Sequence, residues 1–535
     1  MLVLFNGKVY CSGRFDEAVV IDDQKIQYTG TNDGAFAAAG EEADRIDLGG
    51  RLVVPGFIDS HAHGGLMTAS FKGKINLFEG DTVEEYLDII RRYVAEHPDH
   101  KVYKGAGWSS PLFGEVGPAK ELLDEICSDR PIVLKGAEGH SLWANSRAIE
   151  LAGVDEHTPN PMGGVIERNP DGSIHGTFKD EAQSIIDAAV EDDPVALYKE
   201  TILDYQDAMA ALGYTAVAEL MVKRGSNIHK AAIELAEEGK LKMKYLQEFT
   251  VSPLTVDEDL RLLRDRRPGV RNKYIRDQYA KIFIDGVLES QTAWLKQPYS
   301  NRPDFCGEPL WTDEKLFETC AEIDRMGYDI HFHVIGDRAV AQMIDAMEYV
   351  AKANGPRDRR PVAAHIQIMD PADILRMKEA GFVFDANPYW FFKDEIYSKL
   401  NEYPMLGERA DHQYPMKSIM DAGIVVGVGS DYPITEVPSP LYCMKTGVQR
   451  VAYEAEADDE ASLLNPDERV SFDEMFKCVT INSAYAMRIE NITGSIEVGK
   501  DADLVVLDRN IFGDSHFYEA QVDMTISEGD IIYRR

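Results

Sequence analysis

Several features are scarce in this chain of 535 residues, and each scarcity excludes a class of protein. Only six cysteines occur, and no two of them form a CxxC pair. This pattern excludes a zinc ribbon and a dithiol redox centre, and it predicts reduced, packed thiols. No apolar run approaches the roughly 18 to 20 residues that a membrane-spanning helix needs. The expected protein is therefore a globular one without a membrane span.

Basic residues are also scarce relative to acidic ones. Lys and Arg total 56 against 92 Asp and Glu, which gives a formal net charge of −36. Such a balance argues against binding to nucleic acid or to an anionic membrane surface. The N-terminal stretch has neither the basic start nor the long apolar core of a signal peptide, so a cytoplasmic location is expected. The expected partner is a small-molecule substrate, and a homodimer is left open.

The organisation of the chain favours an α/β protein. Strand-like apolar runs alternate with amphipathic helical patterns over several hundred residues, which is typical of parallel α/β architecture. The first fifty-odd residues and the C-terminal stretch instead read as short strands broken by turn residues. We therefore expect residues 1–55 and 488–535 to form one small β-sandwich, because each segment alone has too few strands to bury a face.

Histidines end two of the apolar runs. His61 and His63 stand two apart in FIDSHAH, so on a strand both imidazoles point to the same face. Such a pair makes half a site for a divalent transition metal, although two hydrogen-bonded histidines at a strand end are the alternative. His331 and His333 repeat the spacing in YDIHFHVIGD.

Three further polar residues belong to apolar runs. His365 follows PVAA, Asp431 ends IVVGVGS, and Lys281 stands at the start of an apolar strand. Any one of them could be a satisfied polar group in the core. A lysine in that position is unusual, because burying an ammonium group is costly. Their occurrence in one order, each on its own strand, makes coincidence a poor explanation.

The spacings between these residues fit a (β/α)₈ barrel, in which each βα unit takes roughly 30 residues. His333 and His365 are 32 residues apart, and His365 and Asp431 are 66 apart, which correspond to one and two units. The 220 residues from His61 to Lys281 exceed the three units expected there. The chain therefore predicts a TIM barrel over residues 56–487, with a large insertion after strand 1 and the polar residues on strands 1, 4, 5, 6 and 8.

The motifs resemble those of the metal-dependent amidohydrolase superfamily, and of its YtcJ-like (amidohydrolase 3) family in particular. The strings that carry the resemblance are VPGFIDSHAH, GHSLWANSRAI, KIFIDGVLESQTA, HFHVIGDRAV and VGVGSDYP. The ending GSIEVGKDADLVVLD is similar to the segment by which many superfamily members return to their β-sandwich. This branch includes N-substituted formamide deformylases, and the resemblance spans essentially the whole chain.

The resemblance implies a metal site and a role for each residue. His61 and His63 would bind the more buried metal, Lys281 would bridge two metals as a carbamate, and His333 and His365 would bind the second. Asp431 would bind the first metal and act as the catalytic proton shuttle. Zinc is the expected metal, with manganese or iron as alternatives, and one or two ions per chain remain open. His331 could replace His333 or support the ligands from behind.

The region 66–200 is expected to include an inserted cap over the barrel mouth. Within it, His140, Trp143 and Asn145 belong to the family-like string GHSLWANSRAI and are candidates for substrate contact. The alternative is a folded insertion without substrate contacts, in which Trp143 serves only for packing.

The expected reaction is hydrolysis of a C–N bond in an amide, N-formyl compound or cyclic amide through a metal-activated water. Deamination ranks second, because neither HVIGD nor HIQIM has the glutamate that mononuclear deaminases place after a histidine ligand. Esterase or lactonase activity differs only in the leaving group. A non-enzymatic metal-binding or regulatory protein on the same fold is the rival from another class.

Overall fold

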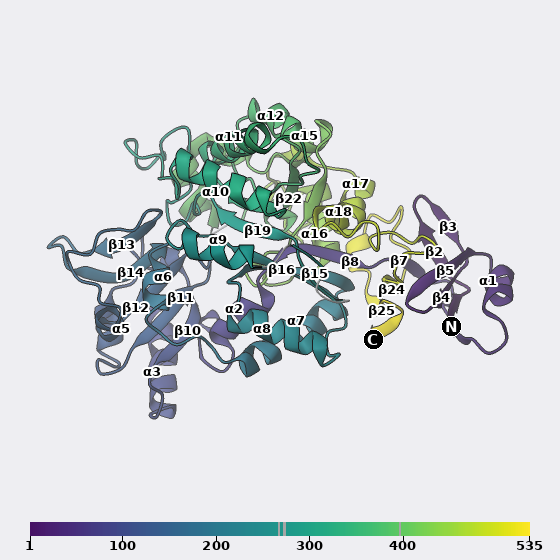
Figure 1. Ribbon diagram of the computed structural model, residues 1–535, viewed down its shortest axis with the longest axis horizontal. Helices are drawn as coiled ribbons and strands as arrows, with labels where there is room; N and C mark the ends of the chain where they lie inside the picture. The colour runs from purple at the N-terminus through teal and green to yellow at the C-terminus, as the bar shows by residue number, and fades with distance from the viewer. Residues whose placement is uncertain (266–267, 271–273, 395–396) are drawn as a thin grey trace.

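The computed structural model describes residues 1–265, 268–270, 274–394 and 397–535. Its centre is a nearly closed barrel of eight parallel strands (Figure 1). The bounds of these strands, in chain order, are β8 Phe57–Ala62, β15 Tyr214–Val222, β16 Lys244–Thr250, β19 Tyr279–Phe283, β20 Asp329–Val334, β21 Val362–His365, β22 Val383–Ala386 and β23 Val426–Val428.

The eight barrel strands pair in the order in which they occur along the chain, as is usual for consecutive strands of a parallel sheet. Parallel ladders join β8 to β15 and then each successive pair as far as β22 and β23. The register places Lys281 opposite His331 and Phe283 opposite His333. His331 therefore lies level with the lysine, and His333 lies one side-chain layer closer to the carboxyl ends of the strands.

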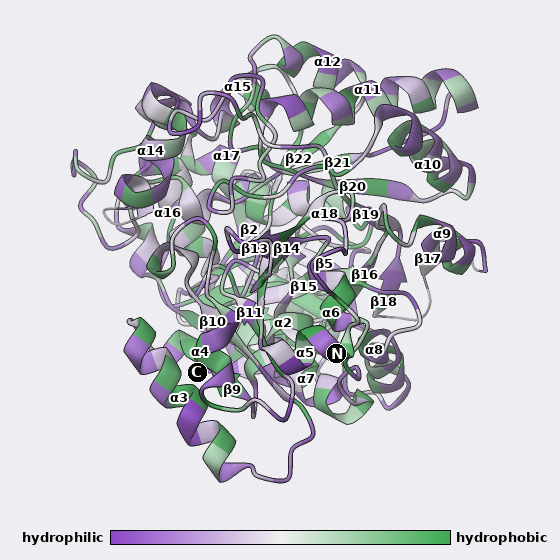
Figure 2. Cartoon of the chain, turned by 90° about the vertical axis from the view of Figure 1, so that its left-hand side faces the viewer, coloured by the Kyte–Doolittle hydropathy of each residue, from purple (hydrophilic) through white to green (hydrophobic). Residues whose placement is uncertain are grey.

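Helices cover the outside of the barrel. The longest is α11 (Asp337–Asn354), in which Val340, Met343, Ile344 and Met347 are buried at spacings of one, three and four residues. That spacing gives an apolar stripe on one side of the helix. Figure 2 shows both hydrophilic and hydrophobic segments along such peripheral helices. The others that surround the barrel are α7 Val195–Ala211, α8 Asn227–Glu237, α9 Val256–Arg264, α10 Asp313–Arg325, α12 Asp373–Glu379, α15 Met416–Asp421, α16 Pro440–Gln449, α17 Phe472–Lys477 and α18 Ser483–Ala486.

A second sheet lies in the segment between β8 and β15, where the spacing predicts an insertion. The segment begins with α2 (Gly64–Phe71) and includes α3 (Val83–Glu96). Six strands pair in the order β13-β14-β12-β11-β10-β9, and they lie on the left of Figure 1. Their bounds are β9 Ile75–Asn76, β10 Tyr103–Trp108, β11 Ile132–Gly136, β12 Ser141–Ala144, β13 Gly164–Arg168 and β14 Ile174–Asp180.

Strands from both ends of the chain share a further sheet. Its order is β26-β25-β24-β7-β2-β3, in which β24 (Leu504–Leu507) pairs antiparallel with β7 (Leu52–Pro55). A four-stranded sheet has the order β5-β4-β1-β6. The two sheets share one apolar cluster, which includes Leu4 of the four-stranded sheet and Ile526 of the six-stranded sheet. The remaining bounds are β1 Leu2–Phe5, β2 Lys8–Cys11, β3 Arg14–Asp16, β4 Ala18–Asp22, β5 Lys25–Gly30, β6 Asp44–Asp47, β25 Val522–Ser527 and β26 Asp530–Arg534.

One lysine joins the barrel to the sheet built from both ends of the chain. Lys244, the first residue of β16, is completely buried, and its Nζ lies 2.7 Å from Asp503, 3.0 Å from Asp501 and 3.3 Å from Glu528. All three carboxylates come from the C-terminal segment. The ion pairs therefore hold the C-terminal segment against the base of the barrel.

Within the described ranges, no helix combines the length and the apolar character needed to cross a bilayer.

We predict that Lys244→Met destabilises the protein by about 3–5 kcal/mol, because it removes the buried cation that Asp503 and Glu528 share. Asp501 keeps its second cation, Lys25, at 2.5 Å. Denaturant unfolding followed by circular dichroism measures the effect. Lys242→Met is the matched control, since the side chain of Lys242 is half exposed. Equal midpoints for Lys244→Met and the wild type would contradict the role given to this lysine.

Candidate metal centre

The closing seam of the barrel, between β8 and the end of β23, brings the first ligands together. The Asp431 N–H donates to the carbonyl oxygen of His61 at 2.7 Å, and the His63 N–H donates to that of Tyr432 at 2.8 Å. A Cβ added to Gly429 would lie only 2.1 Å from the Cβ of His61. Glycine is therefore needed at 429, because no larger residue fits this approach.

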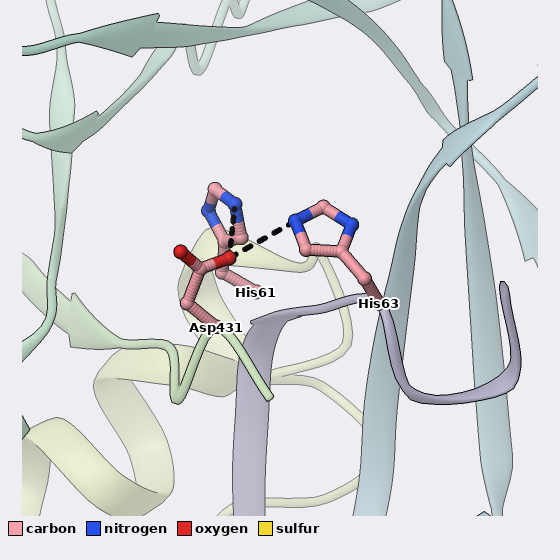
Figure 3. Close-up of side chains that lie close together, drawn as sticks. All are labelled: His61, His63 and Asp431. Atoms are coloured by element: carbon pink, nitrogen blue, oxygen red, sulfur yellow. Dashed lines mark ion pairs between the residues drawn. The ribbon is translucent and has the colours of Figure 1, made fainter. Parts of the chain in front are cut away.

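Three of the predicted ligands converge at this seam. The Nε2 of His63 lies 2.9 Å from Oδ1 of Asp431, and the Nε2 of His61 lies 3.5 Å from the same oxygen (Figure 3). All three side chains are buried. In the described part of the chain, their ligand atoms fall within 4.8 Å of one another, which is close enough to hold one ion.

Lys281 lies directly beside this trio. Its Nζ is 3.4 Å from Nε2 of His61, the side chain is completely buried, and no described carboxylate lies within ion-pair distance. Burial lowers the pKa of this lysine to about 8, against the opposing charges of Glu248, Asp431 and Asp385. A substantial fraction of the side chain is therefore a neutral amine near physiological pH.

His333 and His365 form a second pair, nearer the mouth. Their ring centroids are 4.7 Å apart. The side-chain amide of Asn387 donates to the carbonyl oxygen of Gly429 and accepts from Nδ1 of His365, both at 2.8 Å. The Nε2 of His365 is consequently the nitrogen that carries a lone pair.

His331 does not join that pair. It lies deeper, where its Nδ1 is 2.8 Å from Glu248 and its Nε2 is 3.7 Å from Asp385. Asp385 also lies 3.9 Å from Nδ1 of His61. His61, His331 and Asp385 thus form a second group that could hold an ion, and its position favours a supporting role for His331.

The electrostatics favour ligands that are ready for a cation. Burial lowers the pKa of His365 to about 3 and places those of His61, His331 and His333 well below the ordinary value. Burial alone would raise the pKa of Asp431, but the hydrogen bond and charge of His63 help to lower it to about 2. The centre therefore combines the neutral imidazoles of His61, His333 and His365 with the ionised carboxylate of Asp431, which are the forms that bind metals.

Unpartnered atoms test whether a metal fits. Nδ1 of His61, Nε2 of His331 and Oδ2 of Asp385 are buried and have no hydrogen-bond partner among the described residues. These atoms belong to the deeper group of His61, His331 and Asp385, next to the seam. Buried polar atoms without partners are costly, and a cation there would relieve that cost. Nitrogen and carboxylate donors in this combination suit zinc and related transition metals. The residues present fit a divalent ion.

The backbone at the centre is also unusual. His365 and Asp431 have φ angles of +72° and +57°, in the left-handed region that few residues other than glycine adopt. Such conformations cost free energy and are found most often at functional sites, where surrounding structure enforces them. His365 is the last residue of β21, and Asp431 lies three residues after the end of β23, so both left-handed turns lie at the carboxyl ends of barrel strands.

The centre opens into a cavity of about 1190 Å³. His140 reaches it from the inserted segment, with its ring centroid 5.0 Å from that of His333 and its Nδ1 2.8 Å from Asp180. Phe283 stacks on His333, and Trp390 stacks on His365. The walls around the pair of histidines are therefore largely aromatic.

Of the three residues predicted to contact substrate, only His140 lines this cavity. Trp143 is completely buried, packs in the inserted sheet and donates from Nε1 to the carbonyl oxygen of Ala119. Asn145 caps the helix α5 (Ser146–Leu151) by accepting from the N–H of Ala148. These contacts favour packing and capping roles for Trp143 and Asn145.

The residues that support the ligands were not predicted from the sequence. Asp385 and Asn387 stand at the end of the apolar run FVFDAN, the same signal that identified Asp431. Glu248 gave no comparable signal, because it lies inside the strand KYLQEFT.

The chain belongs to the amidohydrolase family, whose model matches residues 44–533. It is 28% identical to the N-substituted formamide deformylase of Arthrobacter pascens, over 97% of this chain and 95% of that one. Against the putative amidohydrolase YtcJ of Bacillus subtilis it is 27% identical, over 97% and 96%. The crystal structure of an uncharacterized metal-dependent hydrolase from Pyrococcus furiosus aligns with a TM-score of 0.72 at 25% identity, over 95% of this chain and 99% of that one. The resemblance identified from the motifs is confirmed.

We predict that His61→Ala and His365→Ala each lower the metal content of the purified protein and its activity without unfolding it. Each change removes a neutral imidazole ligand but leaves the barrel core intact. Elemental analysis and thermal unfolding measure the two effects. His157→Ala is the control, because the side chain of His157 is 85% exposed. Full metal content in either ligand variant, with unchanged turnover, would refute the assignment.

Proposed function

We propose that this member of the amidohydrolase family hydrolyses a C–N bond of a small molecule, such as an amide, an N-formyl compound or a cyclic amide. The observation that supports this most directly is the convergence of His61, His63 and Asp431 beside the buried Lys281, at the mouth of the barrel and under a large cavity. In barrels of this type the active site lies at the carboxyl ends of the strands.

Six residues would hold the metal. His61, His63 and Asp431 would hold the first ion, His333 and His365 would hold the second, and Lys281 would be a ligand of both. A divalent ion bound here, zinc in the first instance and manganese or iron as alternatives, supplies Lewis acidity that polarises a carbonyl and acidifies water. The neutral state of the imidazoles and the ionised state of Asp431 match what such an ion requires.

Asp431 is the residue that we assign to proton transfer. Its pKa of about 2 keeps the carboxylate ionised at neutral pH, so it can accept a proton. Oδ1 faces both histidines of the seam. The carboxylate would accept the proton of the attacking water and then deliver it to the leaving nitrogen, which departs as a neutral amine.

Lys281 would act as a carbamate. Its neutral amine attacks the carbon of carbon dioxide and loses one proton, which leaves an anionic N-carboxylate on Nζ. The carbamate would supply two oxygen donors to the metal. It also removes the cost of a buried ammonium without a described carboxylate at ion-pair distance.

A screen of N-formyl and N-acyl amines with metal-loaded protein, followed by detection of the free amine, tests the proposed reaction. Amine release that disappears on chelation and returns with added metal is expected. Turnover of the corresponding esters alone would favour esterase activity. A fully loaded protein that cleaves neither class would contradict the proposal.

We predict that Asp431→Asn largely retains metal but lowers kcat by about 10² to 10⁴-fold, as expected for the loss of a general base. Asparagine tolerates the left-handed backbone at 431, so the turn should be preserved. Metal content and kcat are measured on the same preparation. A wild-type kcat in this variant would rule out proton transfer by Asp431.

We predict that Lys281→Ala lowers both metal content and rate, because it removes the bridging oxygens. Added acetate or propionate should partly restore both by placing a carboxylate in the vacated space. Carbon-13 NMR of wild-type protein grown with labelled bicarbonate should show a carbamate signal that is absent from the variant. An unmodified lysine in the metal-loaded protein would contradict this assignment.

A further inference from the structure

One wall of the cavity, next to His140, is lined by carboxylates. Glu138 lies two residues before His140, Glu289 lies in the loop that follows β19, and Glu402 lies in the segment Ser398–Glu402. Tyr397 also lines the cavity, and the negative charges of Glu289 and Glu402 add to burial in raising its pKa. We call Glu138, Glu289 and Glu402 the acidic wall.

The acidic wall has no cation of its own. In the described part of the chain, none of Glu138, Glu289 and Glu402 lies within ion-pair distance of a basic side chain. The basic side chains that line the cavity have acidic neighbours elsewhere: Lys74 and Lys104 with Asp193, Lys135 with Asp187, Lys223 with Glu258, and Arg224 with Asp277. His140 also brings positive charge to the wall, because Asp180, Glu138 and Glu289 raise its pKa against the effect of burial, but its ion pair is with Asp180. Among the described residues, the three carboxylates of the wall therefore share no ion pair with a basic side chain.

Two buried acceptors beside the wall also lack partners. Oδ2 of Asp180 has no hydrogen bond, although its side chain is only 3% exposed. Oε1 of Gln183 is likewise without a partner in a residue that is 9% exposed, while its Nε2 donates to the carbonyl oxygen of Gly139. Both residues line the cavity. Unpartnered buried acceptors are rare in folded proteins, and they indicate a ligand that brings donors.

Burial makes ionisation of two carboxyl groups of the acidic wall costly. It raises the pKa of Glu138, and it raises that of Glu402. Both shifts reflect the cost of keeping a carboxylate ionised without a counterion. Aromatic side chains such as Tyr397 and Trp390 also line the cavity and limit competition from water. An ammonium group would relieve the cost by pairing with the wall.

We propose that the substrate carries a protonated amine, which binds at the acidic wall while the bond to be cleaved lies at His333 and His365. His140 lies between the acidic wall and the pair His333 and His365. Its ring contacts His333, and Glu138 lies two residues before it in the chain. This inference rests on the proposed hydrolysis for the place of the scissile bond. It adds the chemical class of the substrate: an N-acyl or N-formyl derivative that retains a second, basic amine.

Two matched series of substrates test the inference. One comprises mono-N-formyl derivatives of linear α,ω-diamines, and the other comprises N-formyl amino alcohols of the same lengths. We expect kcat/KM to favour the ammonium series by about 10- to 100-fold at the best length, the range for a buried hydrogen bond to a charged group. Glu289→Gln and the double variant Glu138→Gln/Glu289→Gln should reduce that ratio towards one.

The control and a second measurement keep the test independent of folding. Glu237→Gln removes the same charge from the exposed end of α8 and should leave the ratio unchanged. Linear alkylammonium ions should inhibit the wild type more strongly than alcohols of the same length, which requires no variant. Calorimetry with these ions, with and without bound metal, reports binding apart from turnover.

The outcomes separate the two proposals. Equal hydrolysis of both series, or an ammonium preference that Glu289→Gln leaves intact, overturns the inference while the proposed function stands. Binding of alkylammonium that depends on Glu289, without hydrolysis of any C–N substrate, overturns the function and supports the site. A loss of one metal equivalent in the double variant would show that the wall binds metal and would also overturn the inference.

Discussion

The closing seam of the barrel is the constraint on which the centre depends. No ladder of strand hydrogen bonds joins β8 to β23 within the described residues. Side chains join them together with the two backbone hydrogen bonds of Asp431 and His63: Ser60 Oγ donates to the carbonyl oxygen of Val428 at 2.8 Å, and Ser430 Oγ and N–H donate to Asp59 at 2.6 and 2.9 Å. Because Asp431 follows Ser430, this seam sets the distance between Asp431 and the histidines of β8.

Hydrogen bonds at the far side of the rings then decide which nitrogen is offered. Nδ1 of His63 lies 3.4 Å from the carbonyl oxygen of Leu220, so Nε2 faces Asp431. Asn387 produces the same outcome for His365. His333 differs, since its Nε2 lies 3.2 Å from the carbonyl oxygen of Gly286. Nδ1 of His333 is therefore the nitrogen whose lone pair is available to a metal. Each supporting contact therefore fixes which ring nitrogen of its histidine can bind a metal.

The main features that could be predicted from the sequence are those set by strand periodicity. Alternation places His61 and His63 on one face, and the unit length of a barrel places His333 and His365 on neighbouring strands. The roles of Trp143 and Asn145 could not be predicted, because the face that an inserted strand turns to the barrel is decided by tertiary packing. The acidic wall was equally hidden, since Glu138, Glu289 and Glu402 lie far apart in the chain.

The two ends of the cavity differ in the kind of cation that they suit. Three carboxylates near one another could in principle bind a metal, but a site with oxygen donors alone favours hard ions such as magnesium and calcium. The histidines at the other end favour transition metals, and His140, which lies between the ends, is occupied by Asp180. A transition metal would therefore collect at the imidazoles. The acidic wall would then stay available for an ammonium group, so one cavity can hold a metal centre and a cationic substrate without competition between them.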